Sequence, residues 1–95
     1  MKIYLDNPNQ NITQLMRRLG YHPDRRQKSG SLSFSKRLSG ADYPKYHVYL
    51  NKNTNFLNLH LDIKKPSYGG SNAHSGEYDS DLVKTEVQRI KESLV

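Results

Sequence analysis

The chain has 95 residues, a net charge of +6 at neutral pH and no cysteine. This length fits a single small domain over residues 1–95, and without cysteine the protein has neither disulfide bonds nor thiolate metal ligands. No apolar run approaches the roughly 20 residues that a membrane-spanning helix needs. We therefore expect a cytoplasmic protein that does not engage a membrane and whose fold depends on packing alone.

The positive charge is concentrated in the first half of the chain. Residues 1–50 contain nine Lys and Arg against three Asp and Glu, whereas residues 51–95 contain six of each. Such a cluster attracts polyanions, and the release of counterions from phosphates would supply the affinity. A charged surface that only keeps a small protein soluble explains the net positive charge equally well. The uneven distribution favours nucleic acid.

The first predicted element is a helix over residues 12–19. Its apolar residues recur at the spacing i, i+3, i+4 and i+7 of one helix face; they are Ile12, Leu15, Met16 and Leu19. Asn9 or Asn11 can cap the first turn, and Gly20 can end the last one. Residues 21–30 are predicted to connect only, because Pro23 and Gly30 interrupt any period there.

Three strands are predicted in the middle of the chain, over residues 31–38, 46–50 and 56–63. In each, apolar residues alternate with polar ones at a spacing of two, which places them on opposite faces of an extended chain. Ile3 and Leu5 allow a short extra strand near the N-terminus. The alternation predicts strands with one buried and one solvated face.

A second helix is predicted over residues 80–94, with Asp79 or Ser80 as its cap. Its apolar stripe consists of Val83, Val87, Ile90 and Leu94. The predicted order is α-β-β-β-α, an α+β fold in which two helices pack on one face of a three-stranded antiparallel sheet. The other face of the sheet should then be open.

That open face would carry polar, aromatic and imidazole side chains. The residues expected there are Ser33, Ser35, Arg37, His47, Tyr49, Asn58, His60 and Asp62. Exposed sheet faces with rings and cations suit single-stranded nucleic acid, because bases stack on the rings while the cations hold the phosphates. Polar residues are also the ordinary composition of the wet side of an antiparallel sheet.

The order α-β-β-β-α in a small basic chain resembles the double-stranded-RNA-binding fold and the HicA-type toxins, a family of mRNA interferases. The HicA family carries a Gly-Ser-His motif on its first strand, with a catalytic histidine. In this chain Gly30 and Ser31 are followed by Leu32, and no histidine stands there. Residues 57–62 and 64–79 also resemble stretches in short uncharacterised bacterial proteins, which implies no activity.

Residues 64–79 form a long polar segment with three chemical interpretations. His60 and Asp62, followed by His74, Glu77 and Asp79, offer nitrogen and oxygen ligands for a divalent ion. Alternatively, the histidines could exchange protons near neutral pH. In the third interpretation, Lys64 and Lys65 contact an anion. A loop that merely connects a strand to a helix explains the composition equally well.

From these patterns we predict a basic nucleic-acid-binding domain, with RNA favoured over DNA and no cofactor, metal or catalytic group. The alternatives are a ribonuclease that cleaves phosphodiesters and a module that binds an acidic protein. The predicted nucleic-acid contacts are Arg17, Arg18, Arg25, Arg26, Lys28, Lys36, Arg37, Tyr49, Lys64 and Lys65. The residues of the alternative catalytic or metal site are His47, His60, Asp62, His74, Glu77 and Asp79.

Overall fold

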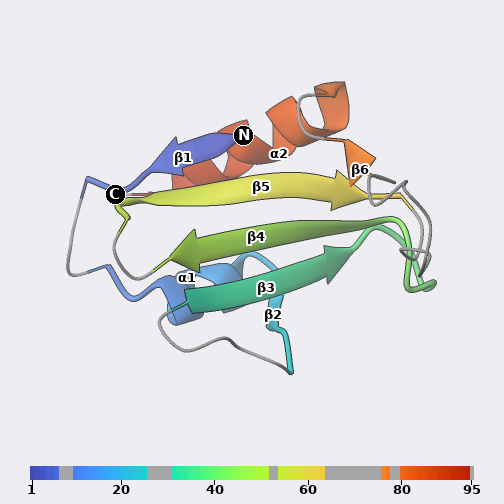
Figure 1. The fold of residues 1–95 in the computed structure, drawn as a ribbon, viewed down its shortest axis with the longest axis horizontal. Coiled ribbons are helices and arrows are strands. Elements are labelled where there is room, and N and C mark those ends of the chain that lie inside the picture. The colour runs from blue at the N-terminus through green and yellow to red at the C-terminus, as the bar shows by residue number, and fades with distance from the viewer. Residues whose placement is uncertain (7–9, 26–30, 52–53, 64–75, 78–79, 95) are drawn as a thin grey trace.

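Five strands lie side by side in one antiparallel sheet in the computed structural model, in the order β1-β5-β4-β3-β2 (Figure 1). A sixth short strand, β6, pairs with the end of β5. The strands are β1 (Lys2–Tyr4), β2 (His22–Pro23), β3 (Ser31–Arg37), β4 (Lys45–Asn51), β5 (Phe56–Asp62) and β6 (Gly76–Glu77). The helices are α1 (Ile12–Arg18) and α2 (Asp81–Ser93). The structure describes residues 1–6, 10–25, 31–51, 54–63, 76–77 and 80–94.

The prediction of an α+β fold is confirmed, but the prediction of a three-stranded sheet is wrong. The extra N-terminal strand exists as β1, which pairs with β5. The second edge strand, β2, pairs with β3 through His22 and Pro23 and falls in the segment predicted to connect only. A strand of two residues shows no alternation, and proline is tolerated in a sheet mainly at an edge. Short edge strands therefore escape a pattern based on alternation.

The three predicted strands are confirmed as β3, β4 and β5, and their registers fix which side chains share a face. His47 pairs with Ser35 on one side and with His60 on the other. Leu57, Leu59 and Leu61 of β5 are all at most 1% exposed. The alternation of β5 thus places its leucines in the core and its polar residues on the opposite face.

Both predicted helices are confirmed, and they lie behind the sheet in Figure 1. Asn11 caps α1 by accepting a hydrogen bond from the backbone N–H of Gln14, and Ser80 caps α2 by accepting one from Val83. Gly20 has a positive φ of 95°, a conformation that favours glycine just after a helix. Among the residues that the structure describes, no helix is long and apolar enough to cross a membrane.

The helices and one face of the sheet bury a single apolar cluster. Its members are Ile3, Ile12, Leu15, Met16, Tyr21, Phe34, Tyr46, Val48, Leu57, Leu59, Leu61, Val83, Val87 and Ile90. Tyr21, which no period predicts, is 1% exposed. Because Tyr21 is buried in the core, the residues directly after it lie beside β3, where they form β2.

The buried carboxylate of Glu86 on α2 belongs to a hydrogen-bond network that links α2 to the end of α1. Glu86 is 5% exposed and accepts hydrogen bonds from the Tyr21 hydroxyl at 2.6 Å and from Arg89 at 2.7 and 2.8 Å. Arg89 also donates to the carbonyl oxygen of Leu19 at the end of α1. Burial raises the pKa of Glu86, but the bonds from Arg89 and Tyr21 and the nearby charge of Lys36 outweigh it and lower the pKa. Glu86 therefore remains ionised in the fold.

The register of β5 predicts a contrast between neighbouring positions. Leu59→Ala should lower the free energy of unfolding by about 2–5 kcal/mol, because it leaves a cavity in the core. Asn58→Ala should cost less than about 1 kcal/mol, because Asn58 lies on the solvated face. Urea denaturation measures both values, and equal losses would contradict the register.

Glu86 predicts a component of acid sensitivity. Because its folded pKa lies below the unfolded one, about 4.3, its stabilisation is complete above that pH and is lost as the pH falls through the folded value. Glu86→Gln should cost about 1–3 kcal/mol at neutral pH, and its gap from the wild type should shrink below about pH 4. Glu92→Gln, an exposed change on α2, is the control. A gap that stays constant from neutral to acid pH in urea denaturation would contradict the proposed role of the charge.

Candidate functional site

The face of the sheet opposite the helices carries polar and aromatic side chains and is here named the open face. No described helix covers it (Figure 1). Its rows follow the strand registers, with Ser35, His47 and His60 in one row. The residues of the open face are Lys2, Tyr4, Ser31, Ser33, Ser35, Arg37, Lys45, His47, Tyr49, Asn51, Phe56, Asn58, His60 and Asp62.

His47, at the centre of the open face, lies between two carboxylates. Its Nε2 is 2.7 Å from an oxygen of Asp24, and its Nδ1 is 3.2 Å from an oxygen of Asp62. Asp24, directly after β2, also accepts hydrogen bonds from the hydroxyls of Ser33 and Ser35, the latter at 2.6 Å. Serine side chains of β3 therefore fix the carboxylate that faces the ring.

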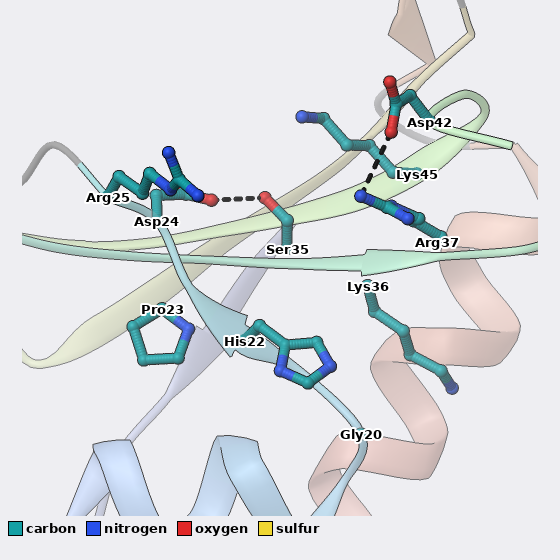
Figure 2. A pocket seen from close by; sticks show the side chains of 10 residues that line it. All are labelled: Gly20, His22, Pro23, Asp24, Arg25, Ser35, Lys36, Arg37, Asp42 and Lys45. Carbon is teal, nitrogen blue, oxygen red and sulfur yellow. Dashed lines mark hydrogen bonds and ion pairs between the residues drawn. The ribbon is translucent and has the colours of Figure 1, made fainter. Parts of the chain in front are cut away.

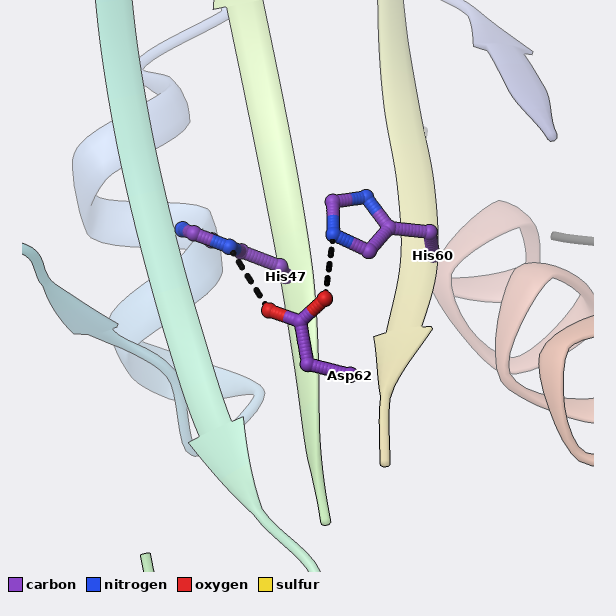
Figure 3. A group of neighbouring side chains, drawn as sticks. All are labelled: His47, His60 and Asp62. Carbon is purple, nitrogen blue, oxygen red and sulfur yellow. Dashed lines mark hydrogen bonds and ion pairs between the residues drawn. The ribbon is translucent and has the colours of Figure 1, made fainter. Parts of the chain in front are cut away.

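Asp62 bridges the two histidines. Its second carboxylate oxygen lies 2.8 Å from Nε2 of His60, and Figure 3 shows the carboxylate between the two imidazole rings. The histidine and aspartate side chains of this group are 14–26% exposed. We name Asp24, His47, His60 and Asp62 the histidine–aspartate cluster. It is shielded enough for its charges to interact strongly and open enough for a ligand to reach.

Within the cluster, the pKa of His47 is raised and the pKa values of Asp24 and Asp62 are lowered, so each group stabilises the charged form of its neighbours. Burial lowers the pKa of His47, but hydrogen bonds and charges from Asp62 and Asp24 outweigh burial and raise it above its usual range. Burial raises the pKa of Asp62, yet the bonds and charges of the two histidines bring it well below its usual range. Burial likewise raises the pKa of Asp24, and bonds from Ser33, Ser35 and His47 lower it overall. Both carboxylates are therefore ionised at neutral pH.

Aromatic rings surround the cluster on the same face. The ring of Tyr49 stacks on that of His60, with centroids 5.3 Å apart and an angle of 19° between the planes, and its hydroxyl lies 2.8 Å from Nδ1 of His47. Farther along β5, Phe56 lies 5.6 Å from the ring of Tyr4. Tyr4 is 59% exposed and Tyr49 is 36% exposed. The open face thus presents rings that can accept further stacking.

A hollow of about 550 Å³ lies beside the cluster, where β3 continues beyond the end of the short β2 (Figure 2). Several of its lining groups carry positive charge, namely Arg25, Lys36, Arg37 and Lys45. Arg37 pairs with Asp42 at 3.0 Å, and both side chains are mostly exposed. Exposed pairs of this kind contribute little net energy. An arriving anion can therefore displace Asp42 at low cost.

The predicted nucleic-acid contacts are distributed over different parts of the molecule. Arg37 and Tyr49 lie on the open face, and Arg25 lines the hollow at its edge. Arg17 and Arg18 are exposed in the last turn of α1, on the helix side. Lys36 lies on the helix side of β3, 3.9 Å from Glu86, and also lines the hollow. Arg26, Lys28, Lys64 and Lys65 lie outside the described residues.

The alternative catalytic or metal residues are partly brought together. His47, His60 and Asp62 converge within one cluster. Glu77 belongs to β6, where its backbone pairs with Leu61. His74 and Asp79 lie outside the described residues.

The sequence patterns missed Asp24 and the aromatic and basic residues at the ends of the sheet. The sequence pattern predicts connecting structure at Asp24, although Pro23 just before it is compatible with an edge strand. Tyr4, Phe56 and Lys2 come together only because β1 pairs with β5. The ammonium group of Lys2 lies 4.6 Å from the centre of the Phe56 ring.

Comparison with protein-family models, with curated proteins and with solved structures finds no match to this chain. The resemblance to HicA-type toxins and to the double-stranded-RNA-binding fold therefore stays a prediction.

The arrangement of charges around His47 gives a direct prediction. Asp24→Asn removes one negative charge and keeps the shape of the side chain, so it should lower the pKa of His47. Titration of the imidazole signals by NMR measures the change. Asp42→Asn, which removes a carboxylate that pairs with Arg37 instead, should change this pKa less. An unchanged His47 pKa in Asp24→Asn would show that Asp24 does not stabilise the protonated ring.

Proposed function

We propose that this protein binds single-stranded RNA on its open face. The observation that carries the proposal is the set of rings on the side of the sheet that no described helix covers, with Tyr49 stacked on His60 and Tyr4 beside Phe56. Bases stack on aromatic side chains with little dependence on sequence, and each such contact contributes about 1–3 kcal/mol. A sheet with exposed rings is a recurring solution for holding unpaired bases.

Cations at the rim of the open face supply contacts for phosphates. Lys2 lies next to Phe56 at one end, and Arg37 pairs in register with Lys45 at the other. The hollow extends this positive rim to Arg25. A strand that crosses the open face would therefore meet cations at both ends, with the rings and the histidine–aspartate cluster between them.

The groups between the rings favour RNA over DNA. The amide of Asn58 can both donate and accept hydrogen bonds, and the carboxylates of the cluster can accept them. The ribose 2′-hydroxyl both donates and accepts, and it is the group by which proteins distinguish RNA from DNA.

The stacking part of the proposal is tested with the full chain and a labelled, short, mixed-sequence RNA in fluorescence anisotropy. Tyr49→Ala and Phe56→Ala should each weaken binding by about tenfold, which corresponds to about 1.4 kcal/mol. Leu82→Ala is the matched control, because it truncates a large side chain that is 50% exposed on α2. Equal affinities for the three variants and the wild type would refute stacking on the open face.

The electrostatic part is tested through the dependence of affinity on salt. Lys45→Ala should lower the slope of log affinity against log salt by about one. Arg17→Ala, on the helix side, should leave it unchanged. The reverse result would move the interface to α1.

The preference for RNA is tested with two further ligands, a single-stranded DNA of the same sequence and polyglutamate. Equal binding of the DNA would refute the preference for RNA. Equal binding of polyglutamate would favour an acidic protein partner.

Phosphodiester cleavage is the second candidate function, favoured by the convergence of His47, His60 and Asp62 on the same face. Cleavage of RNA requires groups that transfer protons within hydrogen-bond reach of the reacting atoms. Incubation of the labelled RNA with the wild type and with His60→Ala tests it. Turnover that the variant lacks would establish an enzyme, and intact RNA in both samples would leave binding as the activity.

A further inference from the structure

We propose that His47, His60 and Asp62 bind a divalent transition-metal ion, for which zinc is the best probe. This inference goes beyond RNA binding and does not depend on it. One ligand atom from each of the three side chains lies within 4.8 Å of the others (Figure 3). The ligands come from adjacent positions on paired strands, β4 and β5, where His47 is the register partner of His60.

The distances fit the geometry of a zinc site. Zinc bonds of about 2.0–2.1 Å to nitrogen and oxygen imply ligand atoms about 3.3 Å apart in a tetrahedron. Asp62 lies 3.2 Å from Nδ1 of His47 and 2.8 Å from Nε2 of His60. The two distances involve different oxygens of Asp62. A small rotation of the carboxylate and of the two rings would bring one oxygen and both nitrogens to the required separation.

Asp24 supplies the support that metal-bound histidines usually have. A histidine that binds a metal through one nitrogen commonly donates a hydrogen bond to a carboxylate through the other. Nε2 of His47 lies 2.7 Å from Asp24, and that carboxylate is held by the hydroxyls of Ser33 and Ser35. This arrangement leaves Nδ1, which faces Asp62, as the metal-binding nitrogen.

Charge and ligand type select the class of ion. Imidazole nitrogens suit zinc, copper, iron and nickel, whereas magnesium and calcium prefer oxygen ligands. With both imidazoles neutral, Asp24 and Asp62 carry two negative charges, which a divalent cation balances. Three protein ligands leave a further position for water or another ligand, as in catalytic rather than structural zinc sites. Tyr49, whose hydroxyl is 2.8 Å from Nδ1 of His47, borders this position.

The decisive experiment is isothermal titration of the tag-free full chain with zinc chloride. The wild type should bind one zinc ion at the cluster. His60→Ala should weaken that binding by more than about 100-fold, and Asp24→Asn, which removes only the outer carboxylate, by about 10–100-fold. His22→Ala is the matched control, because His22 is an exposed histidine outside the group of three ligands, and it should bind zinc as the wild type does. Magnesium should bind much more weakly than zinc.

An NMR measurement on the wild type keeps the proposal testable if a variant does not fold. On addition of zinc, the imidazole signals of His47 and His60 should shift together at one equivalent, while those of His22 should not. Zinc binding that is unchanged in His60→Ala, or wild-type signals of His47 and His60 that do not respond to zinc, would overturn the proposal.

Discussion

The alternation along β5 is the constraint on which the rest of the molecule depends. Its three leucines are completely buried against the helices, so the residues between them must point to the opposite face. A slip of one residue would place His60 in the core and the leucines in solvent. The energy of burying three leucines, about 1.5–3 kcal/mol each, therefore also fixes the position of the cluster. Core packing and site geometry have the same physical origin in this strand.

The carboxylates on the two faces of the sheet have different partners. On the helix side, the carboxylate of Glu86 is matched by hydrogen bonds from Tyr21 and Arg89, and among the described residues no buried side-chain nitrogen or oxygen lacks a partner. On the open face, two carboxylates share the imidazole of His47. The first arrangement suits a permanent joint between α1 and α2. The second concentrates negative charge and ring nitrogens where a ligand can reach them.

Periodicity in the sequence predicted the elements that have enough residues to show a period. It identified both helices, three central strands and the buried side of each, and so placed His47, His60 and Asp62 on one face. It could not predict β2 and β6, since strands of two residues have no measurable alternation. Asp24 was missed for the same reason, because only the pairing of β2 with β3 brings it to His47. The alternation alone did not predict that the long side chain of Lys36, on the helix side of β3, approaches the buried Glu86, and its role as a nucleic-acid contact stays a prediction.

The proposed metal site and the proposed RNA surface share Tyr49 and His60, and this overlap has a thermodynamic consequence. The ring of Tyr49 stacks on His60, while its hydroxyl approaches the nitrogen of His47 that would bind the metal. An ion held by the two histidines would fix the rings on which a base stacks, and its open position would face the same strand of RNA. If the ion strengthens RNA binding, RNA must strengthen binding of the ion by the same factor. The small open face would then act as one coupled site rather than as two neighbouring ones.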